Sequence, residues 1–324
     1  MISAVALFSG GLDSSLAIKI IQLQGIKVIG LHFTTPFCTR SGSACHRVAH
    51  QLGIELRNIP LGENFLAIVE DPPHGYGKNL NPCIDCRILM LKKAKQLMAD
   101  LGGSFIITGE VLNQRPMTQN WKALFEIERQ AGLEGLIERP LSARLLPETI
   151  PQQKGWVDRE RLLAIQGRSR KKQFELARQF RIEEYSTPAG GCLLTDPIFC
   201  GKVRDLIEHN QLTLEEVVLL RLGRHFRLGP EAKLIVGRNE KENLSLLHLI
   251  RPDDIKLEPL QVKGPIAILR GRSDPQSILL AARIVARYSD QKDEMVRIEV
   301  RDHKKKSEIA VNPITDEEIN PIRL

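Results

Sequence analysis

The sequence lacks the segments that would carry the protein into or across a membrane. It has no apolar run of the roughly 18–20 residues that a membrane-spanning helix needs. Its apolar N-terminus has neither a basic flank nor a small-residue cleavage site, so we interpret residues 4–8 as a buried strand rather than a signal peptide. No internal repeat and no low-complexity tract is present. These absences favour a globular protein of the cytoplasm with no membrane partner.

Cysteines are few and the excess of positive charge is modest. In a cytoplasmic chain of 324 residues, six cysteines indicate metal binding or catalysis rather than a disulfide framework. The net charge of +7 is compatible with a polyanionic partner such as RNA but does not require one. A hydrophobic content of 42% is ordinary for a protein with a buried core, and the length suggests two domains.

Strand and helix patterns alternate through the first half of the chain. This order predicts an α/β fold, a parallel sheet sandwiched by helices, in which ligands bind beyond the carboxyl ends of the strands. The expected strands are residues 4–8, 28–33, 55–59 and 105–108, and the expected helices are residues 14–24, 44–52, 87–101 and 158–180.

A Pro/Gly-rich segment at residues 187–191 interrupts these patterns. It predicts a boundary between a domain at residues 1–188 and a second, smaller α+β domain at residues 189–324. The polar tail, residues 303–324, is expected to be mobile.

A glycine-rich turn with the properties of a phosphate-binding loop follows the first expected strand. Two glycines let the backbone turn sharply and approach an anion, and the helix that follows presents unpaired amides. Asp13 would repel bare phosphate, so its presence implies a Mg²⁺ ion between them. No Gly-Lys-Ser/Thr follows, so the turn is not the loop of a γ-phosphate kinase or GTPase. The alternative is a tight turn in which Asp13 or Ser14 only caps the helix.

The string Ser9-Gly10-Gly11-Leu12-Asp13-Ser14 resembles the signature Ser-Gly-Gly-x-Asp-Ser of the PP-loop ATP pyrophosphatase superfamily. The resemblance covers roughly residues 1–185 and implies an adenine nucleotide α-hydrolase-like domain. It implies cleavage of ATP between its α- and β-phosphates and an adenylated intermediate. The ATP contacts that it implies are Ser9, Gly10, Gly11, Asp13, Ser14, Ser15 and, after the fourth expected strand, Gly109.

Cys83 and Cys86 lie three residues apart where a helix is expected to begin, and a helix N-terminus lowers the pKa of a thiol. Two thiols are too few for a closed metal site, and Cys192, which follows two glycines, is the best third. For Cys38 the choice between a functional thiol and a buried one stays open, and Cys45 and Cys200 are expected to be small buried side chains.

The loop, the Asn-Pro-Cys-x-x-Cys string and the later cysteine together resemble the tRNA thiouridine synthases of this superfamily. In one subgroup the sulfur chemistry is carried by two cysteines, here Cys86 and Cys192, through a persulfide. In another, three cysteines hold a [4Fe–4S] cluster with one open iron, here Cys83, Cys86 and Cys192, and we favour this version. The resemblance implies ATP, Mg²⁺, tRNA and a sulfur donor, either sulfide or a persulfide carrier fed by a cysteine desulfurase.

The second domain resembles the NFACT-R type of RNA-binding domain, best over residues 225–290. An RNA backbone needs only positioned cations, which the basic residues of both domains supply. The predicted RNA contacts are Arg168, Lys171, Lys172, Arg238, Arg270 and Arg272.

The sequence therefore predicts an ATP-dependent tRNA sulfurtransferase that adenylates a uridine carbonyl oxygen, with Cys86, Cys192 and Asp13 as catalytic residues. Two alternatives remain. One is a PP-loop enzyme that uses an amine or ammonia nucleophile and carries a structural zinc, and the other is a non-catalytic RNA-binding protein.

Overall fold

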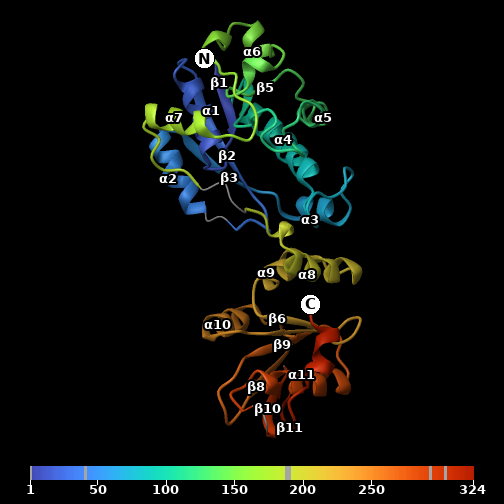
Figure 1. The fold of residues 1–324 in the computed structure, drawn as a ribbon. Coiled ribbons are helices and arrows are strands. Elements are labelled where there is room, and N and C mark those ends of the chain that lie inside the picture. The colour runs from blue at the N-terminus through green and yellow to red at the C-terminus, as the bar shows by residue number, and fades with distance from the viewer. Residues whose placement is uncertain (1, 40–41, 187–190, 292–293, 303–304) are drawn as a thin grey trace. The chain divides into compact units, whose positions relative to one another are not determined.

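The computed structural model describes residues 2–39, 42–186, 191–291, 294–302 and 305–324. Contacts divide the chain into two compact units, Met1–Thr195 and Asp196–Leu324 (Figure 1). The boundary predicted between residues 188 and 189 lies outside the described residues.

The first unit is built on a five-stranded parallel sheet, which confirms the predicted α/β fold. Its strands run in the spatial order β3-β2-β1-β4-β5, and every neighbouring pair is parallel. The strands β1 and β4 are almost wholly apolar and buried, as expected for the centre of a sheet covered on both faces. The strands are β1 Ser3–Leu7, β2 Lys27–Thr34, β3 Glu55–Pro60, β4 Phe105–Thr108 and β5 Ile137–Glu138.

Helices cover both faces of this sheet. Helix α1 contacts α2 and α7, and α4 contacts α3 and α5, so that each group forms one layer (Figure 1). The helices are α1 Leu12–Gln22, α2 Gly42–Leu52, α3 Gly62–Glu70, α4 Cys83–Asp100, α5 Trp121–Ala131, α6 Ile150–Gln153 and α7 Lys171–Gln179. Short 3-10 turns lie at Ala143–Leu145, Arg159–Arg161 and Leu193–Thr195.

The prediction of one helix over residues 158–180 is wrong. Extended chain follows a short 3-10 turn, and α7 begins only at Lys171. Within the extended stretch, the amide of Leu163 donates to the carbonyl of Pro140 at 2.9 Å. The positive φ of Gly167, 85°, is also incompatible with a helix. Hydrogen bonds to distant chain segments replace the helical bonds that the local pattern suggested.

The second unit contains a six-stranded antiparallel sheet with helices, which confirms the predicted smaller α+β domain. The strand order is β11-β10-β8-β9-β7-β6. Helix α11 packs its buried alanine, isoleucine and valine side chains into the core of this sheet. The strands are β6 Arg224–Arg227, β7 Lys233–Val236, β8 Ile255–Pro259, β9 Ala267–Arg270, β10 Val296–Arg301 and β11 Lys306–Val311. The helices are α8 Pro197–Glu208, α9 Leu214–Leu219, α10 Glu240–Leu249, α11 Pro275–Arg287 and α12 Asp316–Ile319, and a last 3-10 turn spans Asn320–Ile322.

The tail was expected to be mobile, and that prediction is wrong for its described part. Strand β11 pairs with β10 along its full length, and α12 begins with a capping box formed by Thr315 and Glu318. The pairing partner lies in the neighbouring strand, so the tail's own polarity did not reveal it. Among the described residues, no helix has the length and the apolar content that crossing a membrane would require.

Candidate active site at the carboxyl edge of the parallel sheet

The strand order of the first unit places the topological switch point of the sheet beside β1. The chain runs to β2 and β3 on one side of this strand and to β4 and β5 on the other. Segments that leave neighbouring strands in opposite directions open a crevice at the carboxyl edge, where ligands of such sheets bind. The predicted phosphate loop follows β1, and Gly109 follows β4, so the two predicted nucleotide segments flank this point.

The glycines bring the loop and the segment after β4 into direct contact. Gly10 has φ of 67°, a conformation that side chains other than glycine rarely adopt. A Cβ atom on Gly109 would lie 2.4 Å from the amide nitrogen of Ser14 and 2.6 Å from the carbonyl carbon of Asp13. No side chain fits there without moving the loop. Gly109 therefore contacts the predicted phosphate loop, and its contact with ATP stays a prediction.

The serines of the loop hold its shape. Helix α1 is capped by Gly11, which offers no side-chain acceptor to the first amides of the helix. Ser14 and Ser15 donate their hydroxyls to the carbonyl oxygen of Gly11, at 2.9 and 3.0 Å, and Ser15 is fully buried. The hydroxyl of Ser9 accepts from the amide of Gly11 at 3.3 Å. The amides at the start of α1 thus remain the groups best suited to a phosphate.

Asp13 is held by two side chains that sequence reasoning did not assign to the site. Its Oδ2 accepts hydrogen bonds from Gln114 Nε2 at 2.8 Å and from Arg170 Nη2 at 3.0 Å. Its Oδ1 is buried and has no hydrogen-bond partner among the described residues. A buried carboxylate oxygen left unpaired suits a hard cation, so the residues present fit the predicted Mg²⁺. Arg170 lies within a run of basic residues, and the sequence of this run does not indicate which side chain points toward Asp13.

A buried charge network connects the nucleotide segment to the cysteine helix. Glu110, which follows Gly109, accepts from Thr108 Oγ1 at 3.0 Å and from Arg139 Nε at 3.1 Å. Its other oxygen forms an ion pair with Arg87 Nε at 3.3 Å. Burial acts to raise the pKa of Glu110, but the Arg87 and Arg139 guanidiniums outweigh it and hold the pKa below its usual value. Arg87 directly follows Cys86, so one carboxylate links both predicted half-sites.

The three segments that carry the cysteines adjoin one another. Helix α4 begins at Cys83, whose thiol donates to Asn81 Oδ1 at 3.1 Å. Cys38 and Cys192 lie opposite each other in an antiparallel bridge. The segment before α4 is tied to the chain beyond Cys192 by a hydrogen bond from the amide of Leu80 to the carbonyl of Leu194, at 3.2 Å.

The electrostatics of Cys86 show that four thiols lie near one another. Burial raises the pKa of Cys86 to about 12; Arg87 opposes the rise, and the nearby Cys192, Cys83 and Cys38 add to it. Burial likewise raises the pKa of Cys83 against the opposing charges of Arg115 and Arg87. The expectation that these pKa values would be lowered is therefore wrong, because burial is the largest cause of both shifts and raises them.

Four neighbouring thiols are a suitable donor set for zinc or an iron–sulfur cluster. Across the described ranges, however, no group of three or more Cys, His, Asp or Glu side chains is arranged to hold a metal ion. The chemistry of the donors fits the cluster, and its ligation stays a prediction. Cys45 and Cys200 are both buried, as small apolar side chains would be.

One predicted RNA contact has a different role. Arg270 is only 8% exposed, and its guanidinium donates to Asp254 at 2.9 and 2.6 Å and to Glu216 at 2.9 Å. It belongs to a buried ion-pair network, so we correct its assignment. The other predicted RNA contacts lie at the surface: Arg168, Lys171, Lys172, Arg238 and Arg272.

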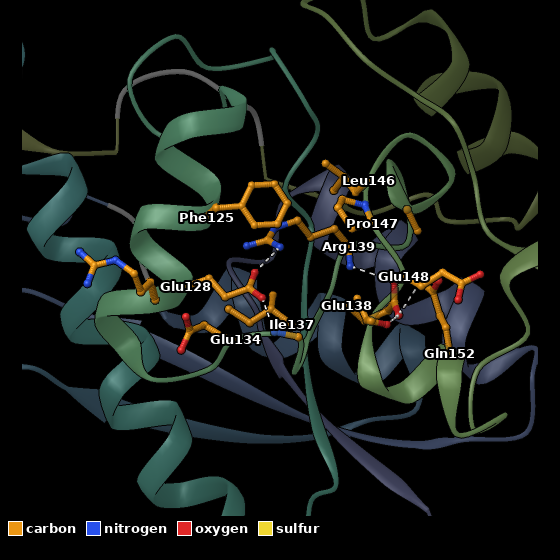
Figure 2. Close-up of a pocket in the computed structure, with 14 residues that line it drawn as sticks. Phe125, Glu128, Glu134, Ile137, Glu138, Arg139, Leu146, Pro147, Glu148 and Gln152 are labelled. Atoms are coloured by element: carbon orange, nitrogen blue, oxygen red, sulfur yellow. Dashed lines mark hydrogen bonds and ion pairs between the residues drawn. The ribbon is translucent and has the colours of Figure 1, made fainter.

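A separate cavity of about 370 Å³ lies beside α5 and β5 in the first unit (Figure 2). Its buried charges are already paired. Glu138 accepts from Thr149 Oγ1 at 2.7 Å and from Gln152 Nε2 at 3.0 Å, and Arg139 donates to Glu128 at 2.8 Å. With these partners in place the charges stabilise the fold, and we assign no ligand to the cavity.

Each of the two units contains residues that match a known family. Residues 3–129 match the family described as the tRNA methyl transferase HUP domain. Residues 223–322 match the family described as the NFACT protein RNA binding domain.

Several curated proteins are similar to part of the chain. The tRNA-specific 2-thiouridylase MnmA of Geobacter metallireducens is 31% identical over 121 residues, covering 30% of this chain and 33% of that protein. The protein of the same name from Pelobacter propionicus is 36% identical over 111 residues, covering 30% and 31%. That of Magnetococcus marinus is 33% identical over 144 residues, covering 38% and 39%. The chain thus spans about a third of the length of these relatives.

The fold is an α/β domain joined to a smaller α+β domain. The first unit is similar to the family described as the tRNA methyl transferase HUP domain and the second to the NFACT protein RNA binding domain. Part of the chain is also similar to proteins named tRNA-specific 2-thiouridylase.

Proposed function

We propose that the protein is an ATP-dependent tRNA sulfurtransferase. The observation that carries this proposal is the meeting of two half-sites at one sheet edge, the loop around Asp13 and the cysteines around Cys86. The ion pair between Glu110 and Arg87 ties these half-sites together. An enzyme that first adenylates a base and then replaces its oxygen with sulfur needs both sites within reach of one uridine.

The first step is adenylation. The carbonyl oxygen of a uridine attacks the α-phosphorus of ATP, the bond to the β-phosphate breaks, and pyrophosphate leaves. The amides at the start of α1 bind the phosphate oxygens, and Asp13 Oδ1 is the atom that would hold Mg²⁺. Positive groups placed where negative charge develops lower the barrier to this step.

The second step replaces oxygen with sulfur. The sulfur atom forms a bond to the activated carbon, and AMP departs with the former carbonyl oxygen. Cys83, Cys86 and Cys192 would hold a [4Fe–4S] cluster, which supplies an iron that can carry the sulfur to be transferred. In the cluster version the sulfur comes from sulfide. In the persulfide version it comes from a persulfide carrier fed by a cysteine desulfurase, which transfers its outer sulfur to one of Cys86 and Cys192. The other cysteine then breaks the S–S bond as the sulfur passes to the uridine, and the resulting disulfide is reopened by a thiol reductant.

The exposed basic residues of both units would bind the tRNA backbone. Phosphate contacts position a nucleic acid without reading its sequence, so the uridine is selected by what reaches the crevice. The match of the second unit to an RNA-binding family supports this role.

The proposal is tested by purifying the protein without oxygen and supplying ATP, Mg²⁺, tRNA and sulfide. We expect iron and sulfide in the protein, AMP and pyrophosphate in equal amounts, and a thiolated uridine in the tRNA by mass spectrometry. Release of ADP and phosphate would contradict the proposal. A colourless, zinc-loaded protein that works in air would favour an amine nucleophile, and no pyrophosphate release at all would favour a non-catalytic RNA-binding protein.

A further inference from the structure

The guanidinium of Arg170 is a buried cation that its protein neighbours do not satisfy. Arg170 is the residue immediately before α7, and its side chain is 16% exposed. One nitrogen, Nη2, donates to Asp13 Oδ2 at 3.0 Å. The Nε and Nη1 atoms are buried and have no hydrogen-bond partner among the described residues. Buried charged donors are costly to leave unpaired and are rare in native structures, so this pair calls for a ligand.

Asp13 and Phe174 contact the Arg170 guanidinium, and Asp13 is itself held by a pair of hydrogen-bonded glutamines. Gln173 is fully buried and donates to Gln114 Oε1 at 3.0 Å, and Gln114 in turn donates to Asp13 Oδ2 at 2.8 Å. The Phe174 ring lies against the guanidinium, with 5.8 Å between the guanidinium carbon and the ring centroid. The unpaired donors therefore sit on a framework that exists before a ligand binds.

The atoms left unpaired in this framework define the ligand chemically. Two N–H groups of a fixed planar cation match the oxygens of a phosphate, which arginine binds through paired hydrogen bonds. The unpaired Oδ1 of Asp13 lies on the same framework and accepts a metal cation instead. A polyphosphate bound together with a divalent cation satisfies both kinds of group.

The contrast with neighbouring cations argues against an RNA phosphate as this ligand. Arg168, Lys171 and Lys172 are exposed, as contacts to a tRNA backbone must be, whereas the two unpaired donors of Arg170 are buried. A ligand that reaches Arg170 must enter the crevice beside Asp13.

We propose that Arg170 binds the two terminal phosphates of ATP and stabilises them as they leave as pyrophosphate. This inference rests on the proposed nucleotide function of the loop. Breaking the bond between the α- and β-phosphates adds negative charge to the pyrophosphate, and a guanidinium fixed beside it stabilises that charge.

The test compares two nucleotides in the full-length protein with Mg²⁺ present. One ligand is an α,β-methylene analogue of ATP, which is not cleaved between those phosphates, and the other is AMP, which lacks both terminal phosphates. Isothermal titration calorimetry gives the two affinities for the wild type, Arg170→Gln, Arg170→Lys and Arg178→Gln. Arg178 is an exposed residue of the last turn of α7 and serves as the matched control.

We expect Arg170→Gln to weaken binding of the ATP analogue by about tenfold or more and to leave AMP binding unchanged. Arg170→Lys keeps the positive charge but lacks the planar guanidinium, so it should lose less affinity for the ATP analogue. Arg178→Gln should bind both nucleotides as the wild type does. A loss that is equal for both nucleotides would mean that Arg170 only maintains the fold, and would overturn the inference.

The same titrations separate this inference from the proposed function. A wild type that binds neither nucleotide would overturn the nucleotide function, and the inference with it. A wild type that binds the ATP analogue, together with an Arg170→Gln variant that binds it equally well, would overturn only the role of Arg170.

Discussion

Arg170 in the first unit and Arg270 in the second are both largely buried beside carboxylates, but they differ in how fully they are paired. Arg270 uses Nε, Nη1 and Nη2 to donate to Asp254, Glu216 and the carbonyl of Leu249. Arg170 makes one hydrogen bond to Asp13 and leaves Nε and Nη1 without a partner among the described residues. Complete pairing marks a residue that stabilises the fold, and incomplete pairing marks one that awaits a ligand.

The largest effect should come from replacing Arg270, the fully paired arginine. Arg270→Met leaves the carboxylates of Asp254 and Glu216 buried without their cation, which should lower the free energy of unfolding by about 3–5 kcal/mol. Urea unfolding monitored by circular dichroism measures this loss. Arg238→Met is the control, because the Arg238 side chain is 48% exposed and its pair with Glu242 should contribute about 1 kcal/mol or less. Equal losses in the two variants would contradict the distinction.

Replacing Asp13, the partner of the incompletely paired Arg170, should lower activity rather than stability. Asp13→Asn removes the charge that would hold the metal, so pyrophosphate release should fall by about 100–1,000-fold while the urea midpoint changes little. Release is measured with tRNA and sulfide present. A variant that keeps wild-type release would show that Asp13 is only a structural cap.

Lys233 is a second buried cation of the second unit, and its pKa predicts how stability depends on pH. Burial lowers the pKa of Lys233, in β7, from 10.5 to about 8, and Asp205 only partly opposes this. Between pH 8 and 10.5 the unfolded chain binds more protons at this residue than the folded chain. Stability should therefore rise with pH through that window, by up to about 3 kcal/mol, and this gain is lost as the pH falls through 8.

Urea unfolding of the wild type and of Lys233→Met at several pH values from 7 to 10.5 measures this contribution as the difference between the two proteins. The raised pKa of Cys86 gives both proteins a slope of the opposite sign above pH 9, and this slope cancels in the difference. A difference that stays constant from pH 8 to 10.5 would contradict the lowered pKa of Lys233.

Gly109 tests how closely the nucleotide segment must approach the loop. In Gly109→Ala the new Cβ would meet the backbone of Ser14 and Asp13, so the loop must shift and ATP affinity should fall by about tenfold. Gly201→Ala is the matched control, since a Cβ at Gly201 in α8 meets nothing within 4 Å. Unchanged ATP binding in Gly109→Ala would show that the loop tolerates displacement.

The smallest effects should come from the exposed cations. Alanine at Arg168, Lys171 or Lys172 should each weaken tRNA binding a few-fold and reduce the salt dependence of binding by about one phosphate contact. Filter binding at several salt concentrations measures both quantities. Nucleotide affinity should not change, and a change would mean that these residues belong to the crevice rather than to the RNA surface.

The sequence predicted the parts of the site that depend on local chain geometry. The glycines of the loop, Asp13 and the spacing of Cys83 and Cys86 are local requirements, and the structure brings the expected segments to one sheet edge. The sequence could not predict that Arg170 and Gln114 belong to the site. The direction of a side chain within a polar run is set by the residues that pack against it.

Burial and distant pairing explain the predictions that failed. The raised pKa values of Cys83 and Cys86 follow from packing that no helix-terminus argument contains. Residues 158–180 are only partly helical because their amides pair with distant carbonyls, and β11 forms because β10 lies beside it. The neighbouring position of Cys38 likewise depends on its bridge to Cys192, more than 150 residues away.

The central claim is that a uridine carbonyl oxygen attacks the α-phosphorus of ATP. Transfer RNA that carries ¹⁸O in its uridine carbonyls tests it directly, through the mass of the AMP released during turnover. The account predicts one ¹⁸O atom in the phosphate of AMP for each uridine that gains sulfur. Unlabelled AMP from thiolated tRNA, or label recovered in pyrophosphate or water, would contradict it.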